Sequence, residues 1–338
     1  MTGPVDLLLA AEGGSEHGLG HVMRCAALAS DARARGLRVG IALRGDEGAR
    51  AALAAESLTS LVRPWSSPLV TRGAAGAVIF DARGEIAPAV REAVSAGART
   101  LVLDRLDLRD VADWTVLPVA HAAPCPHPRV RQGAAWCVIA PEVRGLRRAP
   151  LERRQQRALV TLGGADPRRL TERLAPLVAS RLGEAGAAST DVVVGAAFAD
   201  GPALARWLGR RGFVVHVAPS RRSLAALAAR STFAVCGFGT TVYELAFLGV
   251  PCVYVAHRSA DVADARRLEA VGIGGFGGVA EALDEAVLGE ALAAGPLDPD
   301  WRRARAAQGR ALLDDGAGGS RILDLVLTGG AAQQRAAS

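Results

Sequence analysis

The chain has 338 residues, half of them hydrophobic, and this length suggests two domains. Its 40 basic residues are all arginines, because the sequence contains no lysine, and the net charge is +6. The composition excludes a Schiff-base lysine, a P-loop lysine and a kinase-type lysine, so any bound phosphate must be held by backbone N–H groups, hydroxyls or arginine. The arginines are spread along predicted helices without aromatic interleaving, which argues against nucleic-acid binding.

Cysteine usage and hydropathy indicate where the protein works. The five cysteines are scattered and form no C-x-x-C pair, so free thiols in a reducing cytoplasm are expected. The longest apolar region, 233–256, is broken by glycines, Glu244 and Pro251, and predicts a buried α/β core instead of a membrane span. No cofactor is expected. A metal site at His121, Cys125 and His127 in "HAAPCPH" is not expected either, because it would need a fourth ligand that the sequence does not show.

In the first half of the chain, short β-rich runs alternate with longer amphipathic stretches, the pattern of parallel βα units. Helices are predicted over 20–35, 47–56 and 85–96. Strands are predicted over 6–10, 38–43, 77–80, 100–103 and 114–117.

The pattern breaks at "APEVRGLRRAPLERRQQRAL", residues 140–159, which has two prolines and a run of arginines but no β pattern. We expect the linker there, between an N-terminal domain over 1–145 and a C-terminal domain over 156–330. Strands are then predicted over 158–161, 191–194, 213–217, 233–236 and 252–255. The fold class predicted is α/β, with two Rossmann-like, doubly wound parallel sheets facing a cleft.

The stretch "SEHGLGHVMRCAALA", residues 15–29, leads from the first strand into a helix through Gly18 and Gly20. Glycines at a helix mouth let the backbone approach a ligand, and the helix dipole favours negative charge there. A dinucleotide fingerprint fails, because Met23 stands where its third glycine belongs. His21 falls on the first helical turn, where the dipole favours the neutral imidazole that can act as a base. A tight turn with a surface histidine is the alternative.

Two further strand-to-helix turns are rich in glycine. "VTLGGADP" ends a strand at Gly163 and Gly164, and Asp166-Pro167 suits an N-cap followed by the first helical residue.

His257, just past the last predicted core strand, is a further candidate at the carboxyl ends of the strands.

The stretch "AVCGFGTTVYELAFLGVPCVYV" turns through Gly237 and Gly239, and it places Thr240 and Thr241 at a helix mouth with Glu244 about one turn on. Glycine N–H groups and threonine hydroxyls suit a pyrophosphate, and a carboxylate suits the hydroxyls of a ribose. A helix cap with a solvated Glu244 is the structural alternative.

The motifs "GLGHVMRCAALA", "VTLGGADP" and "CGFGTTVYELAFLGVP", in this order and spacing, resemble the PseG/SpsG family. This family comprises nucleotide-sugar hydrolases of pseudaminic acid biosynthesis and their relatives in spore-coat polysaccharide synthesis. The resemblance covers most of the chain and implies the GT-B-like architecture of MurG-like glycosyltransferases.

The resemblance also implies a division of labour in the site. The C-terminal domain would bind UDP, while His21 would act on the attacking water and Asp81 or Asp104 would orient the water or the sugar. Helix N-termini and hydroxyls would stabilise the leaving diphosphate without a metal. The remaining matched positions are Gly18, Gly20 and Arg24 in the first motif, and Gly163, Gly164, Gly239, Thr240, Thr241 and Glu244 for UDP.

The sequence departs from the family pattern at the positions expected to meet the sugar. The arginine and aspartate expected after the first strand are Ala10 and Glu12, and the tyrosine two residues beyond Asp81 is Arg83. A paired Asp-Asp becomes Asp104-Arg105, and an Asn-Gln pair aligns with Ala260-Asp261. Changes of this kind alter sugar recognition strongly, because polar groups built for hydroxyls are lost.

Three hypotheses follow. The first is a hydrolase that cleaves a UDP-linked amino or deoxy sugar at the anomeric C–O bond. The second is a GT-B glycosyltransferase, in which His21 deprotonates an acceptor hydroxyl in place of water. The third is a non-catalytic partner subunit that binds a nucleotide sugar, which the departures favour and the retained His21 disfavours.

Overall fold

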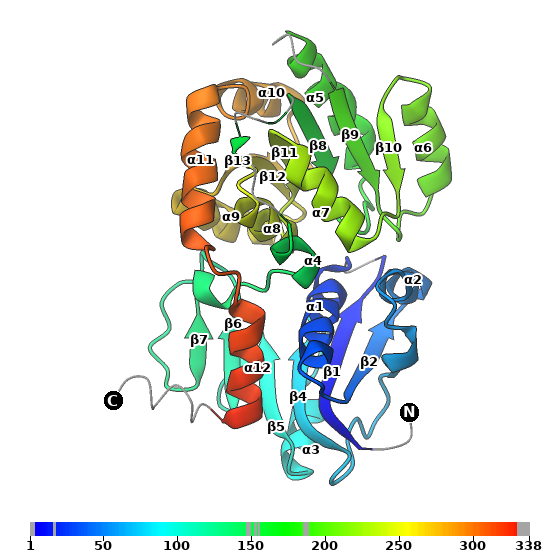
Figure 1. Cartoon of the computed structure of the whole chain (residues 1–338), viewed down its shortest axis with the longest axis vertical. Coiled ribbons are helices and arrows are strands. Elements are labelled where there is room, and N and C mark those ends of the chain that lie inside the picture. Colours follow the sequence, from blue (N-terminus) through cyan, green and yellow to red (C-terminus); the bar gives the residue numbers. More distant parts are fainter. Residues whose placement is uncertain are drawn as a thin grey trace. The chain divides into compact units, whose positions relative to one another are not determined.

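The computed structural model describes residues 4–15, 18–146, 150–151, 154, 156–184 and 189–329. The chain divides into two compact units, each built around a parallel sheet (Figure 1). Unit 1 comprises Met1–Pro141 together with Gly316–Ser338, and unit 2 comprises Glu142–Asp315. Part of the predicted linker, including 147–149, lies outside the described residues.

The sheet of unit 1 has, among the described residues, seven parallel strands in the order β3-β2-β1-β4-β5-β6-β7. The strands are β1 (Val5–Gly13), β2 (Val39–Gly45), β3 (Val62–Pro64), β4 (Ala75–Asp81), β5 (Arg99–Leu103), β6 (Trp114–Leu117) and β7 (Val130–Gln132). The helices are α1 (Gly20–Ala34), α2 (Glu47–Ala55), α3 (Ala87–Ser95) and α12 (Gly318–Thr328). The short helix α4 (Pro141–Arg144) lies at the boundary, with all but its first residue in unit 2. Strand order reverses between β1 and β4, and the crevice at the carboxyl ends of such a pair is where open α/β sheets bind ligands.

The sheet of unit 2 has six parallel strands in its described part, in the order β10-β9-β8-β11-β12-β13. The strands are β8 (Arg157–Thr161), β9 (Ser189–Val194), β10 (Val214–Val217), β11 (Phe233–Gly237), β12 (Cys252–Ala256) and β13 (Gly274–Val279). The helices are α5 (Leu170–Glu184), α6 (Gly201–Gly209), α7 (Arg221–Arg230), α8 (Thr240–Phe247), α9 (Val262–Val271), α10 (Glu285–Ala294) and α11 (Pro299–Leu312). Here the order reverses between β8 and β11.

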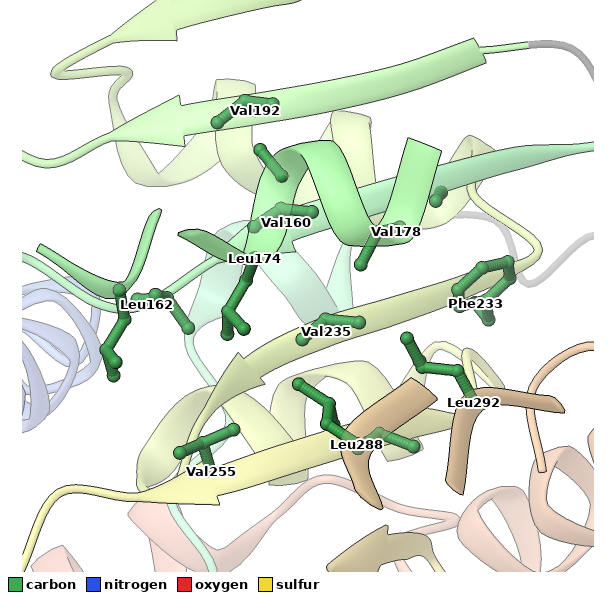
Figure 2. Close-up of a cluster of buried hydrophobic side chains, with 14 of the residues drawn as sticks. Val160, Leu162, Leu174, Val178, Val192, Phe233, Val235, Val255, Leu288 and Leu292 are labelled. Atoms are coloured by element: carbon green, nitrogen blue, oxygen red, sulfur yellow. The ribbon is translucent and has the colours of Figure 1, made fainter. Parts of the chain in front are cut away.

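Apolar side chains of the central strands fill the core of unit 2. Figure 2 shows Val160 and Val235 of adjacent strands packed with Leu174 of α5 and Leu288 of α10. All four are buried. Strands covered on both faces are apolar along their whole length, and for this reason the continuous Val, Leu and Ala runs were readable as strands from the sequence.

All ten predicted strands are present, with ends shifted by a few residues. The structure adds three strands that the sequence analysis missed: β3, β7 and β13. The first two have three residues each, and β13 reads "GGFGGV", so none offers a β-branched run or a clear alternation.

The last helix differs from the domain range expected from the sequence. Residues up to 330 were grouped with the C-terminal domain, whereas α12 packs against the strands of unit 1 (Figure 1). Its apolar face is buried through Ile322, Leu323, Leu325 and Val326. Arg35 at the end of α1 forms an ion pair of 2.6 Å with Asp324. In the described part of the chain, no helix is long and apolar enough to cross a membrane.

Candidate functional site

In unit 1, a loop closed by a backbone hydrogen bond connects β1 to the N-terminus of α1. The N–H of Gly14 donates to the carbonyl of Gly18 at 3.0 Å, which closes the loop; Glu16 and His17 within it lie outside the described residues. Gly18 has φ +74°, a conformation that favours glycine. A Cβ added at Gly18 or Gly20 would meet no described atom within 4 Å, so both positions border open space.

His21 lies on the first turn of α1 and is oriented by a carboxylate. Its Nδ1 lies 2.6 Å from Oδ1 of Asp81, the last residue of β4, and the Asp81 side chain is fully buried. An ionised carboxylate only accepts hydrogen bonds, so Nδ1 carries the proton and Nε2 keeps its lone pair, a tautomer assigned from the bonding pattern. The His21 side chain is 14% exposed, which leaves part of the ring accessible.

Arg24, one turn further along α1, joins two carboxylates. Its Nε donates to Oδ2 of Asp81 at 2.7 Å and its Nη2 donates to Oδ1 at 2.7 Å, a two-point contact. Nη2 also lies 2.7 Å from Oδ2 of Asp104, the residue that follows β5. Asp104 has φ +56°, a strained conformation for a residue with a side chain. The Arg24 guanidinium is buried, so its role is to hold the two acids in place.

The charge of Asp81 follows from its neighbours. Burial opposes ionisation, but the positive charge of Arg24 and the bonds from Arg24 and His21 lower the pKa of Asp81 to about 2. Asp81 is therefore a carboxylate at neutral pH, suited to orienting an imidazole and to stabilising it when it takes up a proton.

The outer nitrogen of His21 also has a partner. Nε of Arg83, in the loop after β4, donates to His21 Nε2 at 3.1 Å. The buried Glu12 of β1 accepts from the N–H groups of Arg83 at 2.9 Å and Gly84 at 2.7 Å. On the other side of the loop, Nη1 of Arg105 donates to the Gly84 carbonyl at 2.8 Å. Burial opposes the charge of Glu12, yet the Gly84 N–H and Arg44 hold its pKa below the ordinary value.

Sequence reasoning noted these three residues one by one, as departures from a family pattern, and missed that they meet. Glu12, Arg83 and Arg105 come from β1 and from the loops after β4 and β5, which are neighbouring strands. The signal that would group them is the strand order, because it brings the carboxyl ends of these three strands to one edge of the sheet.

In unit 2, the residues predicted to hold a nucleotide lie at the carboxyl edge where strand order reverses. Gly163 and Gly164 follow β8, and Gly163 has φ +98° with open space where a side chain would project. A Cβ at Gly195 would lie 2.5 Å from the Gly164 carbonyl, so that loop packs closely on the next one. His257 packs against Gly237 at the same edge, 2.7 Å from where a Cβ would stand.

The helix α8 begins as predicted, with Gly239 as its N-cap and Thr240 as its first residue. A Cβ at Gly239 would meet no described atom within 4 Å, so this helix mouth is accessible. Thr241 and Glu244 lie on one face of α8 and line a small cavity with Leu224 of α7 and other apolar side chains. The structure thus brings the two glycine-rich turns of unit 2 to adjacent strands and sets Glu244 one turn into the helix.

The predicted start of α5 was wrong. Asp166 caps the helix, but its carboxylate accepts from the N–H groups of Leu170 at 2.9 Å and Thr171 at 2.7 Å. The helix begins at Leu170 and not at Pro167, because Arg169 adopts φ +54° and adds a turn before the helix.

Among the described residues, no group of three or more potential metal ligands comes together. His127 of the "HAAPCPH" loop lies with its Nε2 3.2 Å from Oδ1 of Asp110.

Comparison with solved structures identifies the fold. MurG of Acinetobacter baumannii is similar with a TM-score of 0.61 at 15% identity, covering 95% of this chain and 99% of that one. The spinosyn forosaminyltransferase SpnP has a TM-score of 0.64 at 18% identity, covering 96% and 99%. UDP-GlcNAc 2-epimerase from Neisseria meningitidis, bound to UDP-GlcNAc, has a TM-score of 0.60 at 10% identity, covering 95% and 100%. No protein-family model and no curated protein matches the sequence.

The fold class is thus the predicted one: two Rossmann-like parallel-sheet domains of the GT-B type, shared over nearly the whole chain. In both units, the candidate residues lie at the carboxyl ends of the strands where strand order reverses. Sequence identities below 20% establish a similar fold but not a shared reaction. The reaction must therefore be argued from the site.

Proposed function

We propose that this chain is an enzyme acting on a nucleotide sugar, and that it transfers the sugar to an acceptor hydroxyl. The observation that carries the proposal is the His21–Asp81 pair, 2.6 Å apart at the carboxyl edge of β1 and β4. A histidine oriented through Nδ1 by a buried carboxylate presents Nε2 as a general base.

In this reaction, Nε2 of His21 accepts the proton of the acceptor hydroxyl as the oxygen attacks the anomeric carbon. The bond from that carbon to the diphosphate oxygen breaks, and the nucleoside diphosphate leaves with the electron pair. Asp81 stabilises the imidazolium that forms. Asp104 orients the acceptor or the sugar, and Arg24 positions both carboxylates.

Unit 2 holds the nucleotide in this proposal. The N–H groups of the glycine turns and the N-terminus of α8 bind the diphosphate and stabilise its charge as it leaves. Glu244 binds the ribose hydroxyls, and the backbone at Gly18 and Gly20 of unit 1 admits the sugar. The nucleotide-binding residues are Gly163, Gly164, Gly239, Thr240, Thr241 and Glu244.

Transfer is preferred to hydrolysis because the similar structures include a sugar transferase, the forosaminyltransferase SpnP, which is covered over 99% of its length. Hydrolysis of a UDP-linked amino or deoxy sugar is the second candidate, favoured by the motif "GLGHVMRCAALA", which resembles the PseG/SpsG hydrolases. Both reactions use the same base, and they differ in whether a hydroxyl or a water molecule occupies the position next to Nε2.

Product analysis separates these candidates. The purified chain is incubated with UDP- and dTDP-linked sugars, with and without a panel of hydroxyl acceptors, and nucleoside diphosphate release is followed beside sugar products by mass spectrometry. Release that needs an acceptor and yields a glycoside supports transfer, whereas release as free sugar without acceptor supports hydrolysis. Nucleotide binding without release from any sugar would overturn both and leave a binding subunit.

A further inference from the structure

We propose that Arg83 is a positioning residue that covers the base in the free protein. Its Nε donates to Nε2 of His21 at 3.1 Å, the nitrogen that must receive the substrate proton. The inference rests on the proposed function in taking His21 as the base. A hydroxyl can reach that lone pair only by replacing Arg83, because a ring nitrogen has one lone pair.

The hydrogen bonds around His21 fix the state of its ring. Nδ1 donates to Asp81 at 2.6 Å, and a guanidinium has no acceptor, so a proton on Nε2 would face the N–H of Arg83. Arg83 thus occupies the lone pair of Nε2 and holds the ring in a fixed orientation. The Arg83 side chain is exposed, so solvent and a substrate hydroxyl can reach it.

The backbone that carries Arg83 is held from two sides, so its side chain starts from a defined position. Glu12 accepts the N–H groups of Arg83 and Gly84, and Arg105 donates to the Gly84 carbonyl. A Cβ at Gly84 would lie 3.0 Å from the Glu12 carboxylate, which shows how closely the loop sits on this acid. We call the contacts of Glu12 and Arg105 with this loop the clamp.

The cover gives the site a selectivity that a bare histidine would lack. The hydroxyl that displaces Arg83 must compensate a charge-assisted hydrogen bond, so a weakly bound water competes poorly with an acceptor held by other contacts. Arg83 therefore favours transfer over hydrolysis at the same base.

Chemical labelling of His21 tests the cover without any substrate. Diethyl pyrocarbonate reacts with the lone pair of a neutral imidazole nitrogen, and Nδ1 of His21 is closed by the buried Asp81, so the reagent reports on Nε2. The ligand-free protein is labelled at about pH 8, where an ordinary histidine is neutral, and each histidine is followed by peptide mass spectrometry. The variants are Arg83→Met, which lacks a donor, Arg83→Lys, which keeps one, and Arg109→Met as the matched control.

The proposal predicts that His21 is labelled roughly tenfold faster in Arg83→Met than in the wild type, the scale of losing one charge-assisted hydrogen bond. Arg83→Lys restores much of the protection, and Arg109→Met changes nothing, because Arg109 contacts Leu106 and Asp110 away from the base. Unchanged rates at His127 and His216 show that the fold is intact.

Equal labelling of His21 in wild type and Arg83→Met, fast or slow, would overturn the cover. Glu12→Ala removes the acceptor of both loop N–H groups and leaves the Arg83 side chain in place, so it tests the clamp. It is expected to speed labelling by a smaller factor, and a rate equal to wild type would overturn the clamp. Because the labelling needs no turnover, a missing enzymatic activity would count against the proposed function and not against the cover.

Discussion

At the scale of single residues, two acids and two arginines set what His21 can do. Asp81 lies at the end of β4 and receives hydrogen bonds from both His21 and Arg24, so removing its charge affects orientation and stability together. Arg24 is buried between Asp81 and Asp104. A buried ion loses much of its stabilisation when one partner is neutralised, because the remaining charge stays desolvated.

We expect Asp81→Asn to destabilise unit 1 by about 3 kcal/mol at neutral pH, since the Arg24 guanidinium loses its two-point partner. Urea unfolding of both proteins measures this difference. The matched control is Asp264→Asn, which breaks an exposed pair with Arg267 in α9 and is expected to cost less than about 0.5 kcal/mol. Equal costs for the two variants would contradict the assigned burial and pairing.

The lowered pKa of Asp81 predicts that the stability of the protein depends on pH. The pKa of Asp81 is lowered from 3.8 to about 2 in the folded protein, so its stabilising contribution is complete above about pH 4 and is lost as pH falls toward 2. A shift of one pKa unit corresponds to about 1.4 kcal/mol, so the lowered pKa of Asp81 contributes about 2 kcal/mol to the free energy of unfolding. The stability difference between wild type and Asp81→Asn should therefore shrink by that amount between pH 4 and pH 2. A difference that stays constant over this window would show that the pKa of Asp81 is not lowered.

At the scale of elements, α12 completes unit 1 from the far end of the described chain. Its N-terminus passes so close to the segment at Cys137 that a Cβ on Gly318 would overlap the carbonyl oxygen of Cys137. The sequence gives no sign of this contact, because "GAGGSRILDLVL" predicts an amphipathic helix without indicating which sheet it covers.

Gly318→Ala is expected to destabilise the protein by about 2 kcal/mol or more, since the added methyl group must push the start of α12 away from the segment at Cys137. Gly183→Ala in α5 is the matched control: its Cβ meets no described atom within 4 Å, and alanine suits a helix better, so its effect should be neutral or slightly stabilising. Thermal unfolding of the two variants compares them directly. A neutral Gly318→Ala would contradict the packing of α12 on unit 1.

At the scale of the whole molecule, the sequence predicts the architecture better than the site. Strands buried on both faces produce apolar runs, and the turns that follow them are marked by glycine, so ten strands and the α8 mouth were readable. The site depends on pairs distant in the chain: Asp81 is 60 residues from His21 and 57 from Arg24. Family resemblance singled out His21, Arg24, Asp81 and Asp104, but the ion pairs joining them follow only from strand order.

The contacts of Arg83 show most clearly what sequence patterns cannot predict. Local patterns describe Glu12 as a strand-end acid and Arg83 and Arg105 as loop arginines, each ordinary by itself. Their meeting requires β1, β4 and β5 to lie side by side, with one loop held between an acid and an arginine. Periodicity and propensity describe single elements, so they carry no information on such a meeting.

The central claim is that His21 is the base of a reaction on a nucleotide sugar. The most direct test is the rate of nucleoside diphosphate release by His21→Gln beside the wild type, with binding of the nucleoside diphosphate measured on both by calorimetry. We predict a rate lower by roughly 10²–10⁴-fold, the usual contribution of a general base, with nucleotide affinity unchanged. Full activity in His21→Gln would contradict the account.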